Sequence, residues 1–418
     1  MAARSFAIKR GLKEVINRDF LKAGHLPTLL AAFFYFDMSF MVWVMLGPLA
    51  VQMSADLNLS AAQKGFMVAV PVLAGALLRV VNGVLVDRLK PRRAGMIGQV
   101  VVIVGLITVW LLGIESYHAT LWLGLILGVA GASFAVALPL ASRWYPPQYQ
   151  GTALGIAGAG NSGTVFAALL APGLAAWIGW QNVIGLAALP LTLAFIVYLL
   201  AARDAPSAPP PKTWLEYLAV LRISDAWWFM FFYAVTFGGF VGLASSLSIY
   251  FNSEYGLSAV HAGYFTAGCV FAGSLVRPIG GALADRVGGI RALSIMYSIA
   301  ATMLVIVSFR PESPAAALSL FVIAMFAFGM GNGSVFQLVP QRFRHEIGVM
   351  TGLVGMTGGV GGFYLASSLG LSKQLTGSYQ AGLLLFAGLA VVALVGLTGI
   401  KHRWRTTWGA IGATTARI

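Results

Sequence analysis

The recurrence of apolar runs about 20 residues long limits what this chain can fold into. Each run is long enough to cross a bilayer core of roughly 30 Å as an α-helix. There are twelve, at residues 27–53, 63–86, 94–114, 119–142, 150–176, 180–201, 226–251, 259–284, 290–309, 314–340, 346–371 and 379–400. Only 10% of the residues are charged, against roughly 25% in soluble chains. The sequence therefore predicts an all-α integral membrane protein with twelve transmembrane helices.

The net charge of +14 could indicate a nucleic-acid partner, but its distribution indicates membrane orientation. Cations precede the first span and follow every second span, whereas the opposite loops contain only Lys64, Arg310 and Lys373. Loops rich in Lys and Arg stay in the cytoplasm and suit an anionic inner leaflet. We expect a multi-pass protein of the inner (cytoplasmic) membrane with both termini cytoplasmic, surrounded by lipid and not bound to nucleic acid.

The ends of the chain and its one cysteine limit other functions. Residues 1–26 lack the apolar core of a signal peptide, and we interpret them as a cytoplasmic interfacial helix; an unstructured basic tail is the alternative. Cys269 is alone and lies in a span, which excludes a disulfide or a cysteine metal site. The five histidines lie near span ends and form no motif. We expect no cofactor, no metal and no enzymatic activity.

The chain is built from two repeated halves. Residues 74–88, AGALLRVVNGVLVDR, align without a gap with residues 272–286, AGSLVRPIGGALADR. Between the halves, RDAPSAPPPKTW cannot continue a helix because it contains three consecutive prolines. We predict six-helix bundles at 27–202 and 226–400, a cytoplasmic linker at 203–225 and a cytoplasmic tail at 401–418. Parallel repeats of this kind suit alternating access about a site at their interface.

Two arginines occupy equivalent buried positions in the repeats. Arg79 lies nine residues before Arg88, and Arg277 nine before Arg286, which places each roughly 13 Å inside the cytoplasmic end of its helix. A cation at this depth is costly, and Asp37 is the only acidic residue deep in any span. At least one arginine therefore lacks a fixed counter-ion. Pairing with a buried carboxylate is the structural alternative; the functional one is an anion site, because the planar guanidinium binds flat oxyanions with two bonds.

Each of these two spans ends in an Asp-Arg pair. Asp87-Arg88 and Asp285-Arg286 stand in G-x-x-x-D-R motifs followed by basic residues. Two copies at equivalent places resemble the signature of the major facilitator superfamily. The resemblance implies a cytoplasmic gate held shut by ion pairs that break during transport. Helix capping and membrane orientation are the alternative roles.

Glycine-rich runs in the fifth and eleventh spans are also repeat partners, GTALGIAGAGNSGTVF and TGLVGMTGGVGGFYLASS. Glycine at this density permits close helix packing or a narrow pathway in which backbone approaches a small ligand. We assign to pathway faces Gly158, Gly160, Gly163, Gly358, Gly361 and Gly362. Asn161 adds an amide donor, with a helix-packing hydrogen bond as its alternative role.

Together, these features resemble the nitrate/nitrite porters of the major facilitator superfamily over the whole chain. The glycine runs match that family's signature and the two arginines match its anion clamp. The resemblance implies that Asn161 and Tyr233 hydrogen-bond the substrate and that Phe134 and Phe237 enclose it. Tyr233 and Phe237 are four residues apart and share a helix face. We expect a monomeric secondary transporter for nitrate and nitrite; another facilitator, for a different small anion, is the less favoured alternative.

The choice between proton-coupled transport and anion exchange depends on the role of Asp37. This residue lies about ten residues into the first span and so roughly 15 Å deep. It is either a counter-ion for an arginine or a proton site. Entry of the nitrate anion into a cell that is negative inside costs about 2.3 kcal/mol per 100 mV of membrane potential. One co-transported proton cancels this cost. We favour nitrate/proton symport for uptake with Asp37 as the proton-coupling candidate. Nitrate/nitrite antiport, which conserves charge, is the alternative.

Overall fold

The computed structural model describes residues 18–206, 214–343 and 346–407. Most of the expected N-terminal interfacial segment therefore lies outside the described residues, as do residues 207–213 of the linker. The end of that segment forms a short helix, α2 (Arg18–Ala23), whose Phe20 is fully buried and stacks on Tyr145 at 4.8 Å between ring centroids. Another short helix, α13 (Trp214–Leu221), follows the prolines of the linker.

The prediction of twelve transmembrane helices is confirmed. The described residues contain 12 helices long and apolar enough to cross a membrane, and no strand. Seven of these spans are continuous, namely α5 (Ala61–Leu89), α6 (Pro91–Leu112), α14 (Ser224–Tyr255), α17 (Gly289–Ser308), α18 (Pro314–Arg342), α19 (Ile347–Thr376) and α20 (Gln380–Thr407).

The other five spans are interrupted. They are α3 (Leu26–Trp43) with α4 (Leu46–Asp56), α7 (Tyr117–Gly131) with α8 (Phe134–Ser142), α9 (Pro147–Gly158) with η1 (Ala159–Ser162) and α10 (Gly163–Ile178), α11 (Trp180–Leu186) with α12 (Ala188–Ala201), and α15 (Ala259–Ser274) with α16 (Arg277–Val287). Four of these interruptions adjoin Trp43, Phe134, Asn161 and Arg277. Pro278 has no amide hydrogen to continue the α15 ladder, which explains the break before α16.

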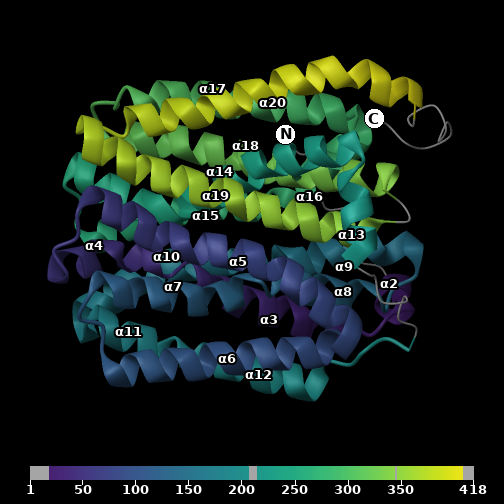
Figure 1. Cartoon of the computed structure of the whole chain (residues 1–418), viewed down its shortest axis with the longest axis horizontal. Coiled ribbons are helices and arrows are strands. Elements are labelled where there is room, and N and C mark those ends of the chain that lie inside the picture. Colours follow the sequence, from purple (N-terminus) through teal and green to yellow (C-terminus); the bar gives the residue numbers. More distant parts are fainter. Residues whose placement is uncertain (1–17, 207–213, 344–345, 408–418) are drawn as a thin grey trace.

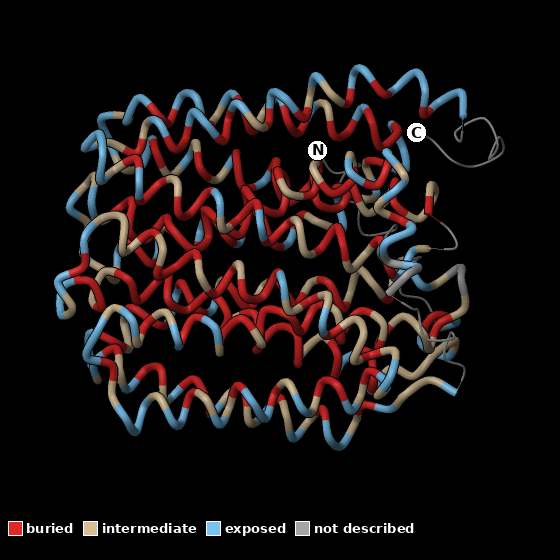
Figure 2. The backbone as a smooth tube through the Cα atoms, in the orientation of Figure 1, coloured by how far each residue is buried: buried red, intermediate tan, exposed pale blue. Residues whose placement is uncertain are grey.

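The first six spans form one block and the last six form the other (Figure 1). Helices α2 and α13 and the C-terminal end of α20 lie at one end of the bundle, which we call the terminal end (Figure 1). The blocks meet where α5 packs on α19, α10 on α15, and α4 on α14. Burial agrees with this arrangement. In the most apolar 18-residue stretch of α14, 89% of the residues are buried, whereas in that of α6, an outer helix, only 22% are buried (Figure 2).

The last helix extends beyond the predicted boundary at residue 400. Helix α20 continues to Thr407 because its end is tied to the start of α14. Asp225 accepts hydrogen bonds from Arg403 and, at 2.9 Å, from the indole nitrogen of Trp404, and it also accepts one from Arg342 at 2.7 Å. These contacts make residues 401–407 part of the bundle, whereas the tail beyond them lies outside the described residues.

The two halves touch at one end and separate at the other. Four glycines spaced by four, three and four residues lie on one face of α19, namely Gly348, Gly352, Gly355 and Gly359. A Cβ added at Gly359 would lie 2.5 Å from Ala76, and one at Gly355 would lie 3.4 Å from Phe134. At Gly352 and Gly348 it would meet nothing within 4 Å. The space between the halves therefore widens toward the terminal end.

The end opposite the terminal end is closed by backbone contact. A Cβ added at Gly65 would lie 2.8 Å from the Cα of Gly370, and one at Gly47 would lie 2.6 Å from the carbonyl oxygen of Ser245. These pairs join α5 to α19 and α4 to α14. No room for a side chain exists in either contact, so the halves are in van der Waals contact there.

Candidate functional site

Arg79 is held by the backbone of both halves. Its side chain lies on α5 and is 1% exposed. Its Nε donates a hydrogen bond to the carbonyl oxygen of Gly131 at 3.3 Å, and its Nη1 donates one to that of Gly355 at 2.5 Å. The second acceptor belongs to α19, in the other half. Nη2 is buried and has no hydrogen-bond partner among the described residues, which leaves its N–H groups for a ligand.

Three aromatic rings surround the same guanidinium group. Its carbon lies 5.2 Å from the ring centroid of Trp43 and 5.1 Å from those of Phe134 and Phe237. Each distance is short enough for a cation–π interaction. Trp43 is itself fixed by a hydrogen bond of 2.7 Å from its indole nitrogen to the carbonyl oxygen of Pro71. These rings partly replace the hydration that Arg79 loses on burial.

Arg277 also lies near the ring of Phe134 and is less enclosed than Arg79. The Arg277 guanidinium carbon is 5.8 Å from the ring of Phe134 and 5.1 Å from that of Phe336. Its Nη1 is buried without a hydrogen-bond partner in the described chain. The residues described form no ion pair between either arginine and a carboxylate. The structure thus brings the two repeat-related arginines to one shared ring.

Two further predicted residues, Tyr233 and Asn161, are buried and carry polar atoms. Tyr233 is fully buried, stacks on Phe237 at 5.2 Å and 7°, and lies close to both arginines, with its hydroxyl group near Arg277 but outside ordinary hydrogen-bond geometry. Its hydroxyl oxygen and the side-chain oxygen of Asn161, a residue 2% exposed, have no hydrogen-bond partner in the described part of the chain. Buried polar atoms are nearly always paired. Unpaired nitrogen atoms on both arginines, close to Tyr233, therefore indicate a polar ligand site.

The carboxyl group of Asp37 lies apart from the arginines. It is 3% exposed and accepts a hydrogen bond of 2.6 Å from the hydroxyl of Ser162. No ion pair joins it to Arg79 or Arg277 within the described residues. Its role as a counter-ion, which the sequence left open, is therefore not observed in this conformation.

The structure corrects the assignment of four glycines to the pathway. A Cβ added at Gly160 would lie 2.5 Å from the Phe36 ring, one at Gly163 would collide with the carbonyl oxygen of Asp37, and one at Gly361 with that of Ala234. Gly362 faces Val241 at a similarly short distance. These glycines allow helices to pack closely, which is the alternative that the sequence also offered.

The remaining two assigned glycines face the site or open space. A Cβ added at Gly358 would lie 2.6 Å from the ring of Tyr233 and 2.9 Å from that of Phe237, so this glycine makes room for the aromatic pair. Gly158 is buried, yet a Cβ there would meet nothing within 4 Å. Gly158 therefore borders the space that widens toward the terminal end.

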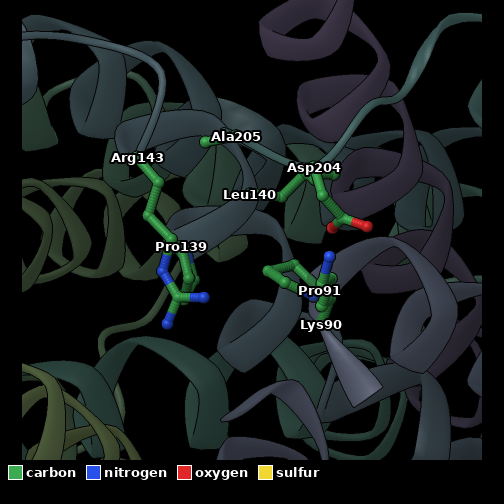
Figure 3. A pocket seen from close by; sticks show the side chains of 7 residues that line it. All are labelled: Lys90, Pro91, Pro139, Leu140, Arg143, Asp204 and Ala205. Atoms are coloured by element: carbon green, nitrogen blue, oxygen red, sulfur yellow. The ribbon is translucent and has the colours of Figure 1, made fainter. Parts of the chain in front are cut away.

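The expected gate residues lie at the terminal end. Asp87 pairs with Arg143 of its own half at 3.2 Å. Arg88, Asp285 and Arg286 are exposed. Beside Arg143 is a hollow of about 10 Å³, where Lys90 and Asp204 extend toward one another (Figure 3). That volume holds about one water molecule, so this hollow is not the anion site, and the gate role stays a prediction.

Several residues of the site were missed from the sequence. Trp43 and Phe336 were not singled out, because an aromatic residue inside an apolar span has no distinguishing spacing. Ser162, which contacts Asp37 and is not part of the anion site, was also missed, although it stands next to Asn161 in the GNSG stretch. A polar residue inside a span beside a predicted contact residue was the available signal.

Two six-helix bundles that open toward one end, with a buried cationic site between them, define a membrane carrier rather than an enzyme. The family model described as Major Facilitator Superfamily matches residues 28–366. The chain belongs to that superfamily and, within it, to the nitrate/nitrite porters.

The relatives agree with this assignment. The chain is 34% identical to the probable nitrate/nitrite transporter NarK2 of Mycobacterium tuberculosis (strain ATCC 25618 / H37Rv), over 88% of this chain and 95% of the relative. It is 30% identical to the nitrite extrusion protein of Bacillus subtilis (strain 168), over 85% and 89%. It is also 30% identical to the probable nitrate/nitrite antiporter NarK1 of Thermus thermophilus, over 86% and 88%.

A solved structure shares the fold. The chain is similar to a bacterial homolog of the human lysosomal transporter Spinster in an inward-facing and occupied conformation, with a TM-score of 0.67. The match covers 90% of this chain and 96% of the other at 18% identity. At that identity the likeness concerns the fold alone.

Proposed function

We propose that this protein carries nitrate across the cytoplasmic membrane by alternating access, with nitrite as a second substrate. The observation that carries the proposal is the pair of unpaired guanidinium nitrogens, on Arg79 and Arg277, at one shared ring and close to Tyr233. The arginines and the tyrosine supply donors, and the Asn161 amide has a donor as well as the unpaired oxygen. No carboxylate of the described residues pairs with the two cations. Such a site favours an anion.

The shape of the site favours a flat, singly charged anion. Nitrate accepts hydrogen bonds at its edge, and the rings of Phe134 and Phe237 can cover its faces. Sulfate and phosphate are tetrahedral and more highly charged, so removing them from water costs more. A site with two cations and several aromatic rings therefore selects nitrate and nitrite over them.

Nitrate/proton symport is the transport mode that we favour. Nitrate uptake against a negative interior costs about 2.3 kcal/mol per 100 mV, and one proton removes this cost. Asp37 has a buried carboxyl group that accepts a hydrogen bond from Ser162 of η1, and Ser162 follows Asn161 in the chain. With the termini in the cytoplasm, the described conformation opens inward.

Nitrate/nitrite antiport is the second candidate. Two cations without a counter-ion at one ring repel one another, and a bound anion on every crossing would relieve this repulsion. The relative from Thermus thermophilus is named a probable nitrate/nitrite antiporter. This candidate needs no titratable residue.

Flux measurements in proteoliposomes separate the two modes. Purified protein is reconstituted as the expected monomer, and uptake of labelled nitrate is driven either by an inward proton gradient or by internal nitrite. Symport predicts accumulation with the proton gradient alone, whereas antiport predicts uptake only with internal nitrite. Competition by nitrite, chlorate, sulfate, phosphate and a sugar tests the substrate class. Inhibition by the sugar but not by nitrite would contradict the proposed function.

A further inference from the structure

The fifth span is interrupted at the point where it packs on Asp37. The 3-10 segment η1 covers Ala159–Ser162, and α10 begins at Gly163. The Ser162 hydroxyl lies 2.6 Å from Oδ1 of Asp37. Gly163 has no room for a side chain against the Asp37 backbone. The carboxyl group is therefore held against the interruption in the helix.

The Ser162 hydroxyl has a second acceptor. Its oxygen lies 2.9 Å from the carbonyl oxygen of Ala159 as well as 2.6 Å from Asp37. When Asp37 is ionised, the hydroxyl donates to the carboxylate. When Asp37 takes up a proton, the acid donates to the Ser162 oxygen, and the serine hydroxyl turns to Ala159. One hydroxyl rotation thus satisfies both protonation states without leaving a buried polar atom unpaired.

A short chain of contacts leads from this pair to the arginines. Asn161 precedes Ser162 in η1 and carries one of the unpaired side-chain oxygens of the site. The hydroxyl of Ser274, in the other half, donates to the carbonyl oxygen of Val270 at 2.8 Å and lies 3.5 Å from the backbone carbonyl oxygen of Asn161. Ser274 ends α15, three residues before Arg277. A change in the hydrogen bonding of η1 therefore reaches both a polar site residue and the start of α16.

Few other charged groups can influence Asp37. The elements packed on α3 are α5, α7, α8, α9, α10, α12 and η1. Of these, α8, α10 and η1 contain no titratable residue. The others contribute Tyr117, His118, Tyr149, Tyr198, Lys64, Arg79, Asp87 and Arg88. Only Arg79 among these is a cation at the depth of the site, and it is bonded to carbonyl groups instead.

We propose that Asp37 and Ser162 form a proton site in which Ser162 is the positioning residue, and that η1 transmits its protonation state to the anion site. This inference rests on the proposed nitrate/proton symport and identifies how the proton is held. The proton comes from the outer solution, is carried on the Asp37 carboxyl group, and leaves to the cytoplasmic solution. No covalent bond other than the O–H bond forms or breaks.

The test compares four variants of the full-length protein in proteoliposomes. Ser162→Ala removes the hydroxyl, Ser162→Cys keeps its shape but provides a weak donor, and Ser162→Thr keeps the hydroxyl. Ser248→Ala is the control, because it removes a buried hydroxyl that pairs with Thr266 at 2.9 Å in the other half. Two rates are measured for each protein: nitrate counterflow at equal pH, and proton uptake driven by a nitrate gradient.

We expect Ser162→Ala and Ser162→Cys to retain counterflow within about twofold while nitrate-driven proton uptake falls about tenfold or more, because a hydrogen bond to a charged group is lost. Ser162→Thr and Ser248→Ala should keep both rates. Should Ser162→Ala not assemble, Ser162→Cys gives the same comparison. Equal loss of both rates in the cysteine variant, or normal proton uptake in it, overturns the inference. Absence of counterflow in the unsubstituted protein would instead overturn the proposed function.

Discussion

Arg79 and Arg277 occupy equivalent positions in the repeat, yet their surroundings differ. Arg79 is 1% exposed and donates to two backbone carbonyl groups among three aromatic rings. Arg277 is partly exposed, contacts two rings, and starts a helix that follows an interruption. Repetition of the sequence therefore placed two cations at one depth, while packing fixed one of them and left the other freer to move.

This difference suggests separate tasks in one site. Arg79 offers one unpaired nitrogen, Nη2, from a fixed position. Its bond to Gly355 also crosses to the other half, so the proposed movement of the halves would break this bond. The Arg277 guanidinium group can reorient around the anion because fewer contacts hold it. The two arginines should then respond differently to the same substitution.

The largest effect is expected for Arg79→Lys. Lysine keeps the charge but cannot donate to both Gly131 and Gly355 from one planar group. One carbonyl oxygen then loses its partner, at a cost of about 1–3 kcal/mol, and transport should be nearly abolished. Thermal unfolding of the purified variant and nitrate counterflow measure the two effects. Unchanged thermal stability would show that the backbone contacts of Arg79 are dispensable.

Arg277→Lys should abolish transport almost as fully but leave the fold intact. Lysine lacks the planar guanidinium group, so the bidentate contact to the anion is lost. The free energy of unfolding should change by no more than about 0.5 kcal/mol. The same two measurements apply. A destabilisation equal to that of Arg79→Lys would remove the distinction between the two arginines, and near-normal counterflow would exclude Arg277 from the clamp.

The rings that accompany each arginine provide a smaller test. Trp43→Phe removes the hydrogen bond to Pro71, and it should destabilise the protein by about 1–2 kcal/mol because that buried carbonyl loses its donor. Phe336→Leu beside Arg277 should instead weaken nitrate binding by about threefold, in keeping with a cation–π contribution of about 0.5–1 kcal/mol. Unfolding and nitrate titration are measured on both variants. Reversal of the two outcomes would contradict the assignment of a fixed and a freer arginine.

Gly355→Ala should have the smallest effect. The added Cβ would lie 3.4 Å from the Phe134 ring and 3.7 Å from Cδ of Arg79, which the structure can accommodate with a small shift. We expect a change of less than about 1 kcal/mol in the free energy of unfolding and a modest loss of counterflow. An abolished fold would show that α5 and α19 approach more closely than described.

The sequence was sufficient for the fold because its signals are strong. Apolar runs of membrane-spanning length predicted every span, and the match around Arg79 and Arg277 revealed the two halves. The ends of spans were less predictable. Helix α20 runs on to Thr407 because Arg403 and Trp404 reach Asp225, a tertiary contact with no local signature.

The site was only partly predictable. Depth and symmetry identified the arginines, because a cation inside a span is rare enough to require a reason. The glycines were harder to assign, because close packing and a pathway produce the same small-residue spacing. Gly163 and Gly361 face backbone, whereas Gly158 faces open space, and this distinction depends on helix rotation.

Determining the structure with nitrate bound would show whether the two arginines form one anion site. We predict flat density between Nη2 of Arg79 and Nη1 of Arg277, next to the ring of Phe134 and within hydrogen-bond distance of the Tyr233 hydroxyl. Arg277 should move more than Arg79 between the two structures. Nitrate bound elsewhere, with both guanidinium groups keeping their present contacts, would contradict the proposed site.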